Sequence, residues 1–151
     1  MSIAITLHIL SVVVWVGGMF FAYMVLRPAA AALLEPPQRL TLWNQVFAGF
    51  FPWVWTAVAL ILATGLWVLF SVFAGFSNVG LYVHLMFVLG LVMMALFMHV
   101  FFAPYKRLKK AVAEQNWPEG GKQLNTIRKI IGFNLLLGLI TIIIAAGGRY
   151  L

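Results

Sequence analysis

Several residue types that carry common protein chemistry are scarce or missing in this chain. Its 151 residues contain no cysteine, and only three of them are acidic. The lack of cysteine excludes disulfides, thiolate metal sites and thiol catalysis. Charged residues make up 9% of the chain, whereas about a quarter is usual in a soluble domain. The composition therefore argues against a water-soluble fold.

Long apolar runs take the place of charge. Hydrophobic residues make up 64% of the chain, and its mean hydropathy is +1.05. Four runs, at about 3–26, 53–73, 79–103 and 130–148, each approach or exceed the ~20 residues that span ~30 Å of hydrocarbon. We therefore predict an all-α integral membrane four-helix bundle, with residues 1–151 forming a single transmembrane domain.

Prolines punctuate this pattern. Pro28 and Pro104 each follow an apolar run, and a proline cannot continue a helix without losing a backbone hydrogen bond, so we expect helices to end there. Pro37 suits the first turn of a short helix at about 38–50. We expect that helix to lie in the membrane interface before Pro52 turns the chain into the second span.

Basic residues give the predicted topology. The formal charge is +7, and seven of the ten basic residues fall between Lys106 and Lys129. Arg27 and Arg39 lie in the first connection, and the middle connection has no charge. By the positive-inside rule the two basic connections are cytoplasmic and both termini are periplasmic. Anionic lipid headgroups are a sufficient partner for this cluster, so nucleic-acid binding is not expected.

Three histidines lie within the predicted spans, where ionisable side chains usually have a function. His8 and His84 are each close to the outer end of their helix, at a matched depth that would allow both to ligate one centre. His99 is about 22 Å deeper than His84, near the cytoplasmic side. The alternative is that neutral imidazoles only hydrogen-bond between packed helices.

Two cofactors fit such a histidine pair. Haem b would lie between helices, with Gly17, Gly18 and Gly90 leaving room for the macrocycle, although the same glycines also suit close helix packing. Copper is the other choice, because imidazole and thioether ligands suit Cu(I). The candidate metal ligands are His8, His84, Met94, Met98 and His99, with Met19, Met24, Met86 and Met93 as further sulfur donors. Methionine is also common core filler, so the choice between haem b and copper stays open.

Other polar residues have more ordinary interpretations. Arg27 could reach the inner lipid headgroups, a haem propionate or a quinone headgroup. Thr64, Asn134 and Thr141 are expected to form hydrogen bonds between helices. The three glutamates fall in connections, and no hydrolase, kinase or nucleotide motif is present.

The first helix resembles a known family. Leu7-His8-Ile9-Leu10, Trp15-Val16-Gly17-Gly18-Met19-Phe20 and Arg27-Pro28-Ala29 resemble the opening of copper resistance D-type bacterial membrane proteins, and Phe50-Phe51-Pro52-Trp53 is similar to their short four-helix members. The resemblance implies an inner-membrane protein of copper uptake or homeostasis, with His8 a functional position. The opening is also similar to that of small membrane-bound protoporphyrinogen oxidases. Those enzymes have a further histidine after the arginine, where this chain has Pro28 and alanines, which argues against that activity.

Three hypotheses follow from these residues. The first is a copper-handling membrane protein without enzymatic activity, with membrane lipids and a periplasmic copper protein as partners. The second is a b-type cytochrome, a haem-dependent oxidoreductase that exchanges electrons with quinol. The third is a scaffold or assembly factor in which the histidines only pack. A homo-oligomer would give His99 a partner from a second copy.

Overall fold

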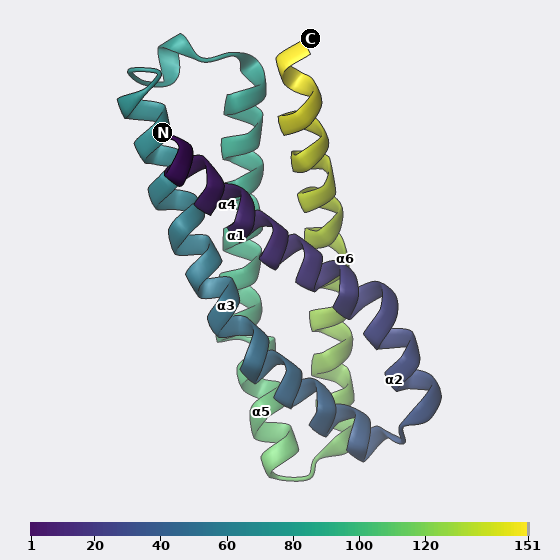
Figure 1. Cartoon of the computed structure of the whole chain (residues 1–151). Helices are drawn as coiled ribbons and strands as arrows, with labels where there is room; N and C mark the ends of the chain where they lie inside the picture. The colour runs from purple at the N-terminus through teal and green to yellow at the C-terminus, as the bar shows by residue number, and fades with distance from the viewer. Residues whose placement is uncertain (151) are drawn as a thin grey trace.

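The computed structural model describes residues 1–150, and these are almost entirely helical. Four long helical segments run along the molecule, as Figure 1 shows. In chain order the elements are α1 (Ser2–Phe21), the π-helix η1 (Ala22–Leu26), α2 (Arg27–Leu33), α3 (Pro36–Ser71), the 3₁₀ turn η2 (Phe76–Asn78), α4 (Leu81–Phe102), α5 (Pro104–Ala113), α6 (Trp117–Gly147) and the 3₁₀ turn η3 (Gly148–Tyr150). Four stretches are long and apolar enough to cross a membrane, which confirms the predicted all-α membrane fold.

The first helical segment does not end at Pro28 as predicted. It passes through the π-helical turn η1 and continues as α2 to Leu33. Pro28 lacks an N–H and its ring crowds the carbonyl four residues earlier, and a widened π-turn just before it accommodates both defects. The proline therefore changes the helical geometry without ending the helix.

The second helical segment also differs from the prediction. Residues 38–50 do not form a separate short helix, because α3 runs without a break from Pro36 to Ser71 and contains Pro52. Pro36 and Pro37 begin the helix, as Pro37 was expected to do. Pro52 removes only one backbone donor, and aromatic contacts on either side of it, from Phe51 and from Trp55 to Phe97, hold both halves of α3 against α4.

The long basic stretch between the third and fourth apolar runs is helical. α4 ends at Phe102, as the position of Pro104 predicts, but Pro104 at once begins α5. After a short turn, α6 begins at Trp117, thirteen residues before the predicted start at about 130. Asn116 caps α6, since its side chain accepts a hydrogen bond from the Glu119 backbone N–H at 3.4 Å. The bundle therefore continues as packed helices beyond the apolar runs.

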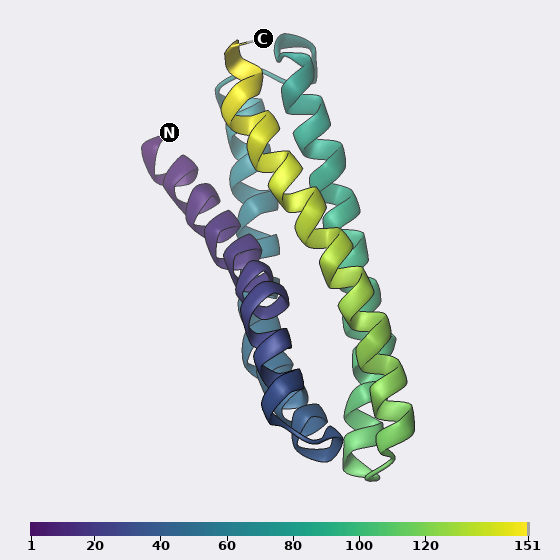
Figure 2. The same cartoon turned by 90° about the vertical axis from the view of Figure 1, so that its right-hand side faces the viewer.

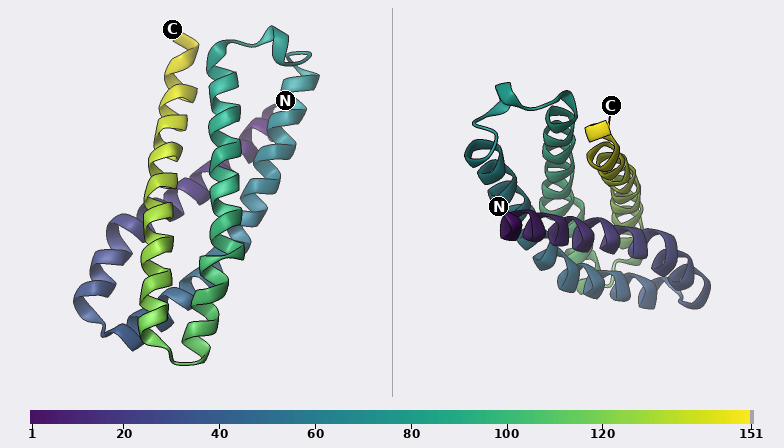
Figure 3. Two further views of the ribbon diagram at one scale, coloured as in Figure 1. Left: turned by 180° about the vertical axis from the view of Figure 1, so that it is seen from behind. Right: turned by 45° about the horizontal axis from the view of Figure 1, so that its top comes forward.

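The helices associate in two pairs. α1 packs on α3, while α4 and α5 pack on α6 (Figure 2). Both termini lie toward the end at which α3 and α4 are connected, and the two basic connections lie at the opposite end (Figure 3). Among the most completely buried side chains, Leu108 and Ile127 are near the basic end. Many large apolar side chains elsewhere, such as Val13 at 60% exposure, face outward, as lipid contact requires.

Candidate functional site

A partly open cavity of about 330 Å³ lies between α1, α3, α4 and α6. Most of its lining is apolar, and the described residues that form its walls include no charged side chain. The side chains in its lining that could bind a ligand are His8, Thr64, Tyr82, Met86, Met93, Met94 and Thr141. The structure therefore gathers one imidazole and three thioethers around a space that is otherwise hydrophobic.

A hydrogen bond between helices orients His8. Its Nδ1 is 3.0 Å from Oγ1 of Thr64, on α3. The Thr64 hydroxyl donates its single proton to the carbonyl of Leu60 in its own helix, so it accepts the hydrogen bond from His8. Nδ1 therefore carries the ring proton, and Nε2 keeps a free lone pair. This is the tautomer that a metal-ligating histidine adopts when its other nitrogen donates to a second residue.

Gly65 gives the imidazole its place beside α3. A Cβ atom at this position would lie 3.3 Å from Cε1 and 3.7 Å from Nδ1 of His8. Such a contact is tight enough to require a shift of the ring. The adjacent pair Thr64 and Gly65 thus supplies both the hydrogen-bond partner and the space that His8 uses.

His84 has different surroundings. Its Nδ1 donates to the carbonyl of Gly80 at 3.2 Å, and its ring lies 5.7 Å from the ring of Phe76, centroid to centroid. It is not part of the cavity lining. The reason lies in the packing, since α1 is held against α3 and α4 against α6. A centre shared by His8 and His84 stays a prediction.

The other predicted ligands on α4 are divided between interior and surface. Met94 is buried and lines the cavity, as do Met86 and Met93. Met98 is 43% exposed, and His99 is exposed as well. Within residues 1–150, no group of three or more histidine, cysteine or carboxylate side chains could hold a metal ion. A metal site in this region would therefore depend on methionine sulfur.

The glycines proposed to leave room for a macrocycle have separate roles. Gly18 is covered by the ring of Phe50, so it serves the close packing of α1 on α3. Gly17 and Gly90 have open space where a Cβ would be, and Gly90 lines the cavity.

Two of the three predicted polar contacts between helices are present. Asn134 on α6 donates from Nδ2 to the carbonyl of Met93 on α4 at 3.3 Å, and Thr64 contacts His8. The prediction for Thr141 is wrong, because its hydroxyl donates to the carbonyl of Leu137 in its own helix. A threonine inside a helix can satisfy its hydroxyl locally, without a partner from another helix.

Arg27 lies at the opposite end of the bundle from the cavity of His8. Its Nε donates to the carbonyl of Tyr23 at 3.2 Å, and its Cζ lies 4.5 Å from the centre of the Tyr23 ring. The contact to a lipid headgroup or a propionate stays a prediction.

A family comparison adds to this geometry. The family model described as Copper resistance protein D matches residues 44–147, from the first third of α3 to the end of α6. The chain belongs to the copper resistance protein D family. Neither the curated proteins nor the solved structures that were compared gave a match.

The family match covers only part of the lining of the His8 cavity. The matched range includes Thr64, Met86, Met93 and Met94, but it does not include α1 and therefore does not reach His8. The role of His8 depends on the cavity geometry and on the resemblance of the first helix.

The contact of His8 with Thr64 was not predicted, although the sequence contains a signal for it. His8 lies six residues after the start of α1, and Thr64 lies seven residues before the end of α3. Consecutive spans run in opposite directions, so these two positions have matching depths. Matching depth in the membrane therefore predicts Thr64 as a neighbour of His8 as readily as it predicts His84.

Proposed function

We propose that this chain is a copper-handling protein of the bacterial inner membrane, which binds Cu(I) as its cargo in the cavity of His8. The observation that supports the proposal is the lining of that cavity, which includes the His8 imidazole and the thioethers of Met86, Met93 and Met94. Imidazole and thioether are ligands that suit Cu(I).

The charge of the cavity also favours a monovalent ion. Its lining has no carboxylate, so a bound ion would keep its full charge in an apolar interior. Burying one charge costs much less than burying two, and neutral soft ligands therefore select Cu(I) over divalent ions. The Nε2 atom of His8, whose lone pair is not used in the hydrogen bond to Thr64, is the nitrogen that would bind the ion.

Orientation follows from the basic connections. The positive-inside rule puts the α2–α3 and α5–α6 connections in the cytoplasm and both termini in the periplasm. The cavity of His8 then lies in the outer half of the membrane, accessible to a periplasmic copper donor. This arrangement suits a part in copper uptake or homeostasis.

Copper loading of purified protein tests the proposal. The protein, in detergent and under reducing conditions, is titrated with Cu(I) against a chromophoric chelator, and bound copper is measured by elemental analysis. We expect about one Cu(I) per chain in the native protein and loss of that copper in His8→Ala. His99→Ala is the matched control, because His99 is an exposed histidine outside the cavity, and it should bind copper normally.

The same sample distinguishes the alternatives. A Soret band that shifts on reduction would support the b-type cytochrome, which requires a second axial ligand besides His8, since the cavity lining contains one histidine. A colourless protein that binds no Cu(I) would support the scaffold. Equal copper binding by the native protein and His8→Ala would overturn the proposed site.

A further inference from the structure

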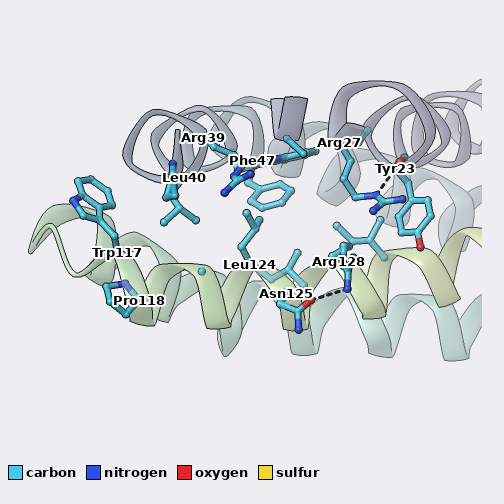
Figure 4. Close-up of a pocket in the computed structure, with 17 residues that line it drawn as sticks. Tyr23, Arg27, Arg39, Leu40, Phe47, Trp117, Pro118, Leu124, Asn125 and Arg128 are labelled. Carbon is cyan, nitrogen blue, oxygen red and sulfur yellow. Dashed lines mark hydrogen bonds between the residues drawn. The ribbon is translucent and has the colours of Figure 1, made fainter. Parts of the chain in front are cut away.

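A second pocket, at the basic end of the molecule, has a different chemical character. Its volume is about 630 Å³, and it lies between η1, α2 and the beginning of α3 on one side and the first half of α6 on the other. Three arginines line it: Arg27, Arg39 and Arg128. Figure 4 shows Arg27 and Arg39 on one wall and Arg128 on the other, with apolar side chains between them.

The positive charge of this pocket is not balanced locally. Its lining residues include no carboxylate, so the three guanidinium groups repel one another without a counter-charge in the pocket. An arginine does not lose its proton in a protein, and so the charge cannot be removed by titration. Among residues 1–150, Arg27 donates a hydrogen bond only to a backbone carbonyl, and Arg128 only to the side-chain oxygen of Asn125, at 2.7 Å. Both are neutral acceptors, which leaves further N–H donors for an anion.

The walls of the pocket are apolar. Trp43 and Phe47 are buried on the α3 side, and Leu124 and Ile131 face them from α6. A small hydrated anion would gain nothing from these surfaces. A ligand with an anionic head and a hydrocarbon tail would use both parts of the lining.

The depth of the arginines also fits a membrane lipid. Arg27 comes directly after the first apolar run, and Arg128 comes just before the fourth, so both lie where the hydrocarbon ends. Phosphate groups of the lipid headgroups occupy that level, and arginine binds phosphate through paired hydrogen bonds.

We propose that this pocket binds an anionic phospholipid, with its phosphate held by Arg27, Arg39 and Arg128 and an acyl chain against the apolar walls. The site is separate from the cavity of His8 and does not depend on copper binding. It would join α2 and α3 to α6 at the end of the bundle where these helices meet.

Lipid retention tests the proposal. The purified protein is delipidated by prolonged washing in mild detergent, and the remaining phospholipid is measured by native mass spectrometry. We expect about one anionic phospholipid per native chain and loss of that lipid when all three arginines are changed to glutamine. The control changes Lys106, Lys109 and Lys110 on α5 to glutamine, which removes the same charge outside the pocket and should keep the lipid. Equal lipid loss in both triple variants would overturn the site, since it would show only a general attraction of positive charge.

Two further measurements keep the test decisive. Arg128→Gln changes an exposed side chain that should not affect folding, and we expect it to weaken binding of phosphatidylglycerol about tenfold. Phosphatidylglycerol should raise the melting temperature of the delipidated native protein, whereas phosphatidylcholine and inorganic phosphate should not. Stabilisation by inorganic phosphate alone would instead identify a site for a small soluble anion.

Discussion

The imidazole of His8 and the hydroxyl of Thr64, which are 56 positions apart in the chain, lie 3.0 Å from each other across the α1–α3 contact. Because the Thr64 hydroxyl gives its proton to Leu60, this contact determines which nitrogen of His8 is protonated and which can bind a ligand. One hydrogen bond thus connects the packing of two helices to the chemistry of the cavity.

Thr64→Val removes this partner while keeping nearly the same shape. Without the acceptor, His8 is free to change tautomer and to rotate. We therefore expect the affinity for Cu(I) to fall about 10- to 100-fold, which is the usual effect of removing a residue that hydrogen-bonds a metal-ligating histidine. Chelator competition measures this change. Thr56→Val, in which an exposed threonine of α3 loses its bond to the Pro52 carbonyl, should have normal affinity. Unchanged affinity in Thr64→Val would show that His8 needs no orienting partner.

Gly65→Ala tests the space that His8 occupies. The new Cβ would lie 3.3 Å from Cε1 of His8, so the ring must shift from the place in which it contacts Thr64. We expect a lower Cu(I) affinity than in the native protein. Gly49→Ala, at a position of α3 with open space, is the control and should leave the affinity unchanged. If Gly65→Ala binds Cu(I) as tightly as Gly49→Ala does, the position of the ring does not matter for binding.

Gly18→Ala tests the close packing of α1 on α3. A Cβ at position 18 would overlap the ring of Phe50, whereas a Cβ at the adjacent Gly17 would meet nothing. We expect Gly18→Ala to lower the free energy of unfolding by about 1–3 kcal/mol, as overpacking does. Gly17→Ala should leave stability equal or slightly higher, because alanine favours a helix. Thermal unfolding in detergent compares the two variants, and equal melting temperatures would contradict the packing.

Topology reporters test the proposed orientation. A periplasmic reporter enzyme fused after Tyr150 should be active, and the same enzyme fused after Glu114, in the α5–α6 connection, should be inactive. Changing the seven basic residues between Lys106 and Lys129 to glutamine should weaken this preference, since the lysines and arginines produce it. Activity at position 114 in the native sequence would reverse the orientation and place the cavity of His8 on the cytoplasmic side.

Local rules predicted the spans but not the effects of every proline. Apolar run length was enough for four membrane-crossing helices, because hydrocarbon thickness fixes how many residues a span needs. Pro28 was expected to end a helix and Pro52 to turn the chain between two helices, and both lie inside longer helical segments. A proline removes a single donor, and tertiary packing on either side of it can outweigh that loss.

The basic stretch from Lys106 to Lys129 is a second region whose local structure the sequence did not predict. Its charges mark one end of the molecule, yet charge says nothing about whether a segment is a loop or a helix. α5 and the first half of α6 are helical because apolar side chains such as Leu108 and Ile127 pack together and become fully buried. This burial also requires α3, which is distant in the chain and packs against both α5 and α6.

By itself, the amino-acid sequence determined the helical class, the four spans, the basic end and the residue types that could bind copper, because these depend on composition and on distances along the chain. Only the tertiary structure decided which of those residues meet. It brings His8 to Thr64, puts His8 and methionines of α4 in the lining of one cavity, sets His84 against Phe76, and places three arginines around one pocket. The physical reason is that depth in a membrane can be counted along one helix, whereas the neighbours of a side chain depend on how the helices pair, tilt and rotate.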